Sequence, residues 1–296
     1  MNELMRPSFK SFRLFSLLVV SLIAGAMQQP TATQAQDDTR RDIISEDFLM
    51  SRPAKRNATK APTKPRSTYR QASSTPTRQS DQPHLQVGLT IWKLEPVTTA
   101  ERRSVSERDR SGTGWTRVEA DAQFREGDAL RLSIESPRAG YLYVVDRDSL
   151  ADGSAGESNL IFPTEGEDNR LEPGKLIDIP APGDVPFRAT PKPNQTGELL
   201  TFIVTSSPLA LPLSKRPLPI SQTQLSDWQQ KWGAEGDRFE MNGGAGQPRT
   251  REEQRAASAT DTRQLTREDP LPQTVYSLVP KSRNALLFNL VLSYVR

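Results

Sequence analysis

The chain has 296 residues, of which 34% are hydrophobic and 24 are prolines, and its formal net charge is +3 at pH 7. This composition is too poor in apolar residues for a compact fold over the whole length, so we expect one domain of ordinary size flanked by poorly ordered segments. There is no cysteine, which excludes a disulfide framework, a thiolate metal site, a thiol nucleophile and a lipid-modified cysteine anchor.

Residues 1–35 have the composition of a secretory signal peptide. Basic residues precede an apolar run at 14–23, and small residues follow it. The run is shorter than the roughly 20 apolar residues that cross a bilayer, so we expect removal of the leader, after Ala26 or after Ala35. The sequence therefore predicts an exported protein, periplasmic or extracellular. The alternative is an uncleaved signal that anchors the chain in the inner membrane.

Residues 36–84 are rich in Thr, Ser, Pro, Gln, Lys and Arg, so we expect a disordered basic linker. An apolar island at 43–50 is predicted to be an unstructured tail rather than a short docking helix, because a short helix is unstable alone. Between positions 52 and 78 the linker is a basic arm without acidic residues, which predicts binding to an anionic membrane surface; the alternative is a soluble spacer. The arm contains Arg52, Lys55, Arg56, Lys60, Lys64, Arg66, Arg70 and Arg78.

From Leu85 onward the apolar residues recur with period two. Leu85, Val87, Leu89 and Ile91 form one apolar row, and residues 130–135 repeat the pattern with polar residues between the apolar ones. Further short runs bounded by Gly, Pro, Asn or Asp lie at 140–146, 159–162, 175–179, 187–189 and 199–205. The spacing predicts an all-β domain over 85–209, mainly an antiparallel β-sandwich of the Ig-like class.

Residues 210–296 are predicted to be a C-terminal extension. One short helix is expected at about 221–233, where Ser221 can cap and Gln224 completes a capping box. A polar, mobile loop is expected over 234–272, with a short helix near 251–257. A closing strand at 284–295 has its apolar residues on one face, which would be costly to leave in water.

Several short blocks recur in a recognisable order within residues 85–209. They are FREGDALRL at 124–132, GYLYVVD at 140–146, NLIFPT at 159–164, NRLEPGKLIDIP at 169–180, Phe187 with Pro191, and IVTSSP at 203–208. Together they resemble the bacterial domain of unknown function family 4384. Members of that family look like β-sandwich accessory modules behind signal peptides, or attached to regulatory kinases and caspase-like peptidases. The resemblance implies an accessory module and assigns no site residue.

No residue pattern predicts catalysis or a bound cofactor. His84 is the only histidine, and it lies at the edge of the linker, which leaves no Ser-His-Asp triad and no histidine-based zinc site. The glycines at 243–246 follow no predicted strand, so they indicate a flexible loop rather than a phosphate-binding motif. Trp92, Tyr141 and Tyr143 can line a ligand face, but we expect them to pack within the sheets.

One acidic cluster is a weak candidate for a metal site. Asp146, Asp148, Asp152 and Glu157 echo the spacing of a calcium loop. Leu150 and Ala151, however, stand where an oxygen ligand and the required glycine should be. The alternative is a plain acidic hairpin loop.

The sequence therefore predicts a non-catalytic binding or accessory module of the bacterial cell envelope. Its partner is expected to be an envelope protein or glycan, and not a nucleic acid. The chain is expected to be exported, and the residues outside 1–35 and the basic arm carry 28 basic against 35 acidic side chains. One alternative is a carboxylate-dependent enzyme that uses Asp146 and Asp148 on an envelope polymer. Another is a structural subunit of a surface or secretion assembly.

Overall fold

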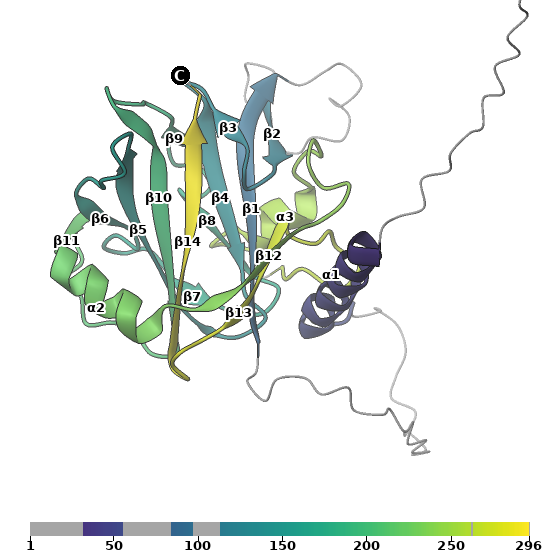
Figure 1. Ribbon diagram of the computed structural model, residues 1–296. Helices are drawn as coiled ribbons and strands as arrows, with labels where there is room; N and C mark the ends of the chain where they lie inside the picture. The colour runs from purple at the N-terminus through teal and green to yellow at the C-terminus, as the bar shows by residue number, and fades with distance from the viewer. Residues whose placement is uncertain (1–31, 56–83, 97–112, 262, 296) are drawn as a thin grey trace, which may run out of the picture.

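The computed structural model describes residues 32–55, 84–96, 113–261 and 263–295, which form two β-sheets and three helices (Figure 1). The first sheet has the order β12-β13-β1-β4-β8, with β2 beside β1 and β9 beside β4, and all of these pairs are antiparallel. Its strands are β1 (Leu85–Pro96), β2 (Thr113–Val118), β4 (Ala129–Glu135), β8 (Leu176–Ile179), β9 (Phe187–Arg188), β12 (Glu235–Glu240) and β13 (Thr274–Val279).

The second sheet has the order β11-β6-β5-β10-β14-β3, with β7 beside β5. Its pairs are antiparallel, apart from the short parallel pair of β14 with β3. The mainly antiparallel β architecture that the sequence predicts is therefore confirmed. The strands are β3 (Gln123–Phe124), β5 (Gly140–Leu150), β6 (Ser158–Phe162), β7 (Arg170–Leu171), β10 (Gln195–Thr205), β11 (Leu218–Ile220) and β14 (Ala285–Tyr294).

Apolar side chains from both sheets meet in one hydrophobic core. Val87, Leu89 and Ile91 of β1 belong to the same buried cluster as Phe202 of β10 and Phe288 of β14. The two phenylalanine rings stack with their centroids 5.1 Å apart. Burial of one such side chain stabilises the fold by about 1.5–3 kcal/mol. The period-two rows therefore select the strand register that turns them inward.

The other face of the first sheet is buried as well, which the sequence does not predict. All seven residues of β4 are buried, including the alternate polar residues Arg131, Ser133 and Glu135. Such polar positions normally mark the solvent side of an antiparallel sheet. Here the N-terminal helix and the segment 241–273 lie over this face (Figure 1). The polar row of β4 is thus an internal layer.

The N-terminal helix α1 (Ala32–Ser51) corrects the prediction of an unstructured tail. Ile44 and Phe48, one helical turn apart, are buried in a small cluster with residues of β12 and β13. Gly88 on β1 makes room, because a Cβ atom there would lie 2.8 Å from Cζ of Phe48. Packing of this kind supplies most of a helix's stability. The predicted disorder of 36–84 is wrong over 36–55, and 56–83 lie outside the described residues.

Arg52, directly after α1, is held against the first sheet by buried hydrogen bonds. Its guanidinium donates two hydrogen bonds of 2.7 Å to the two carboxylate oxygens of Glu135 on β4. It also donates to the main-chain oxygens of Asp269 and Pro270, at 2.8 and 2.9 Å. Burial raises the pKa of the Glu135 carboxyl, and the Arg52 guanidinium opposes that rise. The pair leaves neither charge in contact with water, since the side chains are 1% and 2% exposed.

Two further buried ion pairs hold the segment 241–273 against the same sheet. Arg249 lies 2.7 Å from the carboxylate of Asp178 on β8, and Arg117 on β2 is paired with Glu253. Both guanidinium groups lie over the ring of Trp92, at 5.2 Å for Arg117 and 5.4 Å for Arg249. The indole nitrogen of Trp92 donates to the Ser133 hydroxyl at 2.7 Å. Charge pairing and ring contacts therefore offset part of the cost of burying these charged groups.

The last third of the chain is not an extension but part of both sheets. The strand β13 lies between β12 and β1, and β14 lies between β10 and β3. The pairing of β14 with β10 has no register shift from Ala285 to Ser293. The predicted boundary at residue 209 is therefore wrong, because the chain after residue 209 supplies strands to both sheets. The predicted mobile loop at 234–272 is also wrong, since it holds β12 and a buried part of the covering layer.

Two short helices lie between the strands of this region. The helix α2 (Gln222–Trp232) forms where one is predicted, and the Ser221 hydroxyl accepts from the Gln224 amide. The helix α3 (Arg251–Ala256) begins with a complete capping box of Thr250 and Glu253. The helix α3 lies where a short helix is expected near 251–257, and α1 is the helix that the sequence does not predict. Among the described residues, no helix is long and apolar enough to cross a membrane.

We expect Arg52→Ala to lower the free energy of unfolding by about 3–5 kcal/mol, because it leaves the Glu135 carboxylate buried without a partner. The matched control is Lys55→Ala, which breaks an exposed pair with Glu268. That change should leave the free energy of unfolding close to that of the wild type, because exposed ion pairs contribute little. Urea denaturation of the two variants measures the difference. Equal losses would show that Arg52 does not hold the N-terminal segment in place.

Candidate functional site

At one end of the core, the residues of β5 and β10 that face inward change from apolar to acidic. On β5, Leu142 and Val144 point into the core, and Asp146 and Asp148 continue the same row. On β10, Glu198 pairs in register with Asp148. The Tyr294 hydroxyl at the end of β14 donates to Glu198. We call Asp146, Asp148, Glu198 and Tyr294 the acidic end.

The electrostatics of the acidic end centre on Asp146. Burial, together with the neighbouring carboxylates of Glu198 and Asp148, raises the pKa of Asp146 to about 7. Its Oδ1 atom is buried without a hydrogen-bond partner among the described residues. Burial also raises the pKa of Glu198. The Asp148 carboxylate has two polar neighbours, since Lys192 lies 2.6 Å from it and Gln195 donates to it at 3.0 Å. Near neutral pH the acidic end can therefore hold a proton on Asp146.

The structure does not assemble the acidic cluster that the sequence singles out. Asp152 lies in an exposed turn, where it accepts hydrogen bonds from the amide and hydroxyl of Ser154 at 2.9 and 2.6 Å. Glu157 is exposed, whereas Asp146 and Asp148 point inward. Within the ranges that the structure describes, no three acidic or histidine side chains are placed to hold a metal ion. Asp146 and Asp148 join Glu198 and Tyr294 instead.

The predicted basic arm has two described members, and one of them does not face the solvent. Arg52 is buried against Glu135, so its predicted role at an anionic surface is wrong. Lys55 is exposed and lies 2.8 Å from Glu268. The remaining six, Arg56, Lys60, Lys64, Arg66, Arg70 and Arg78, lie outside the described residues. Membrane binding by the arm stays a prediction for those six.

The aromatic residues singled out in the sequence pack inside the fold. Trp92 is fully buried in the first sheet beneath the covering layer. Tyr143 is buried in the second sheet, where its hydroxyl accepts from the Leu209 amide at 2.7 Å. Tyr141 is half-buried near the same side. The three residues therefore form no common ligand face. His84 is exposed, and its ring nitrogen lies 3.4 Å from the Ser277 hydroxyl.

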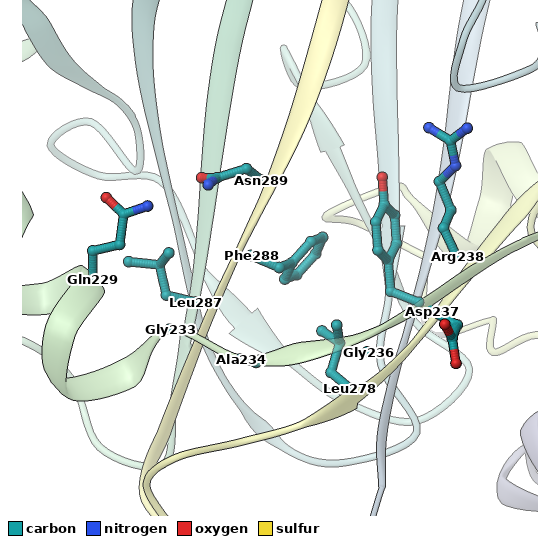
Figure 2. Close-up of a pocket in the computed structure, with 11 residues that line it drawn as sticks. Gln229, Gly233, Ala234, Gly236, Asp237, Arg238, Leu278, Leu287, Phe288 and Asn289 are labelled. Atoms are coloured by element: carbon teal, nitrogen blue, oxygen red, sulfur yellow. The ribbon is translucent and has the colours of Figure 1, made fainter.

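A cleft lies where the edges of the two sheets approach each other. Figure 2 shows Gln229, Leu287 and Asn289 on one side of it and Asp237 and Arg238 on the other. Its volume is about 230 Å³. Pockets for small molecules measure roughly 300–1,000 Å³. This edge cleft therefore suits one or two side chains of a larger partner.

The floor of the edge cleft is aromatic and well ordered by packing. Phe288 of β14 and Tyr276 of β13 line it, with ring centroids 4.6 Å apart. They are only 5% and 6% exposed, because both rings belong to the core. Burial raises the pKa of Tyr276 to about 12, so its hydroxyl stays protonated. The edge cleft thus combines an apolar floor with a rim of amide and charged groups.

Comparison of the chain with protein-family models, with curated proteins and with solved structures finds no match. The resemblance to family 4384 therefore stays a prediction.

We expect Asp146→Asn to change how stability depends on pH. The folded-state pKa of about 7 lies above the ordinary 3.8, so the folded protein binds an extra proton between these values. Through this group the stability of the wild type should fall as pH rises from about 4 to 7, by on the order of 4 kcal/mol, and then level off. Asp146→Asn should remove this fall. Urea denaturation at pH 4, 6 and 8 tests it, with Asp152→Asn as the exposed control that should keep the fall.

Proposed function

We propose that this protein is an exported, non-catalytic binding or accessory module of the bacterial cell envelope, and that it engages a protein partner at the edge cleft. The observation that supports binding of a partner is the edge cleft, which has an apolar floor between two sheet edges. A site of this size accepts an anchoring side chain of a partner rather than a free small molecule. Composition supports the export, because residues 1–35 have the three parts of a secretory signal.

The exposure of the aromatic residues favours a protein partner over a glycan. A sugar ring needs an exposed aromatic face on which to stack. Phe288 and Tyr276 offer only 5% and 6% of their surface, so neither presents a free ring face. The rim instead carries the amide groups of Gln229 and Asn289 and the charges of Asp237 and Arg238. These groups suit the main chain and polar side chains of a polypeptide.

We also propose that the domain is an Ig-like β-sandwich. The order β1-β4-β8 in one sheet and β6-β5-β10-β14 in the other supports this. Taken across each sheet in that order, these strands correspond to A, B and E in one sheet and to C′, C, F and G in the other sheet of the immunoglobulin arrangement. Sandwiches of this class commonly serve as interaction modules on surfaces exposed to the cell exterior. Fold analogy alone does not assign a function, so the edge cleft carries the argument.

The acidic end supports one alternative, a carboxylate-dependent enzyme that acts on an envelope polymer. Asp146 has a pKa of about 7 and an oxygen without a partner, which are features of a general acid or base. On our proposal, the purified protein should not turn over cell-wall glycan. Measurable turnover that is lost in Asp146→Asn and retained in Asp152→Asn would favour the enzyme instead.

We expect Gln229→Trp to reduce partner capture about tenfold, because the larger side chain fills the mouth of the edge cleft. Gln229 is exposed on α2 and lines the cleft, and its exposed neighbour Gln230 does not line it. Gln230→Trp is therefore the matched control. The assay is affinity capture of the tagged protein from solubilised native envelope at high salt. A protein retained equally by both variants, or retention of glycan only, would contradict the proposed site.

A further inference from the structure

The middle of β14 is an open sheet edge. On one side β14 pairs with β10 along its length. On the other side, the described neighbours touch only its two ends. The Ala234 amide donates to the Leu287 carbonyl at 2.8 Å, and β3 pairs with Ser293 and Tyr294. Between these contacts, the side of residues 288–292 that faces away from β10 has no strand partner within the described part of the chain.

The direction of the main chain shows which groups face outward. The Leu287 carbonyl accepts from Ala234, and the Val295 amide donates to Phe124, so both groups point away from β10. Main-chain polar groups alternate sides along a regular strand, and this one has no register shift. Asn289 and Val291 therefore present their amides and carbonyls outward. Both residues are exposed, Val291 to 49%.

This stretch lacks the usual protection of an edge strand. Natural edges carry charges, prolines or bulges that prevent pairing with another chain. The sequence of 288–292 is Phe-Asn-Leu-Val-Leu and contains none of these. The contrast is β12, the edge of the first sheet, whose sequence Glu-Gly-Asp-Arg-Phe-Glu is mostly charged. An open, neutral, β-prone edge beside a cleft is the geometry of strand addition.

We propose that β14 binds an extended segment of a partner protein by strand addition at residues 288–292. The segment would form main-chain hydrogen bonds with Asn289 and Val291, and one of its apolar side chains would enter the edge cleft over Phe288. The paired part of the partner segment would span about five residues, which is the length of the unpaired stretch 288–292. Both flanking contacts run parallel to β14, so the segment is expected to run parallel too. The inference rests on the proposed function and names the chemistry of its partner.

A second copy of β14 does not fit this gap. The strand has ten residues, so a copy laid along the edge would run past both ends of the five-residue opening. There it would meet residues 233–234 at one end and β3 at the other. A flexible segment can enter the opening and turn away at each end. The geometry therefore favours an extended, locally unfolded stretch of another protein.

The test uses Val291→Pro and its matched control Val291→Thr. Proline removes the outward amide of Val291 without removing a bond to β10, and edge strands tolerate proline at such positions. Threonine keeps the amide and the branched shape. The probe is a displayed library of random linear heptapeptides, selected against the full wild-type chain. We expect selected peptides to bind wild type and Val291→Thr alike and to bind Val291→Pro at least about tenfold more weakly.

Hydrogen exchange on the wild type gives a second readout that needs no variant. A bound heptapeptide should slow exchange at the amides of Asn289 and Val291, which have no strand partner on the side facing away from β10 among the described residues. The amide of Leu290 already faces β10 and should change little. Failure to select any peptide, equal binding to Val291→Pro, protection elsewhere, or self-association through β14 would each overturn the inference.

Failure of this inference can be distinguished from failure of the proposed function. An envelope protein that is lost in Gln229→Trp but kept in Val291→Pro leaves the binding function in place and overturns strand addition. If the envelope yields no protein partner at the edge cleft, the proposed function fails as well. A melting temperature near that of the wild type confirms that Val291→Pro is folded.

Discussion

The burial of charge on the first sheet is the constraint on which the rest of the fold depends. Arg52, Arg117 and Arg249 each meet a buried carboxylate, from Glu135, Glu253 and Asp178 respectively. Removing one partner of such a pair leaves an uncompensated charge in a dry environment, which costs several kcal/mol. The covering layer can therefore occupy only the one position in which all three pairs close.

This constraint fixes the placement of segments that are distant in sequence. Arg52 precedes β1, Arg249 lies near α3, and both reach the same face of one sheet. With that face covered, the accessible features of the domain lie at its margins. They are the acidic end on the second sheet, the edge cleft and the open edge of β14. Binding at a margin leaves the buried pairs undisturbed, which suits a module that presents a rigid edge to its partner.

Part of the candidate site follows from residue patterns, and part does not. The sequence singles out Asp146 as part of an acidic cluster, but it is the structure that places this residue on the inward row of β5, where burial raises its pKa. Its neighbours Glu198 and Tyr294 come from strands 52 and 148 residues later, so only strand pairing brings them together. No sequence pattern marks the edge cleft, because it forms where the chain leaves β14 after the contacts of Gly233 and Ala234 with Leu287 and enters β12 of the other sheet. The sequence held one signal for the packing of α1: Gly88 lies inside a strand, and a glycine there often marks the close approach of another segment.

The sequence by itself determined the β-rich class, the strands β1, β4 and β14, and the capped helix α2, because period-two burial and end-capping are local effects. Only the tertiary structure decided that α1 forms, that Arg52 is buried, and that residues 210–296 complete both sheets. The physical reason is that these features depend on contacts between distant segments. From the sequence, an arginine in a basic stretch such as Arg52 is expected to be solvated. Its partner Glu135 is 83 residues away along the chain and becomes its neighbour only in the fold.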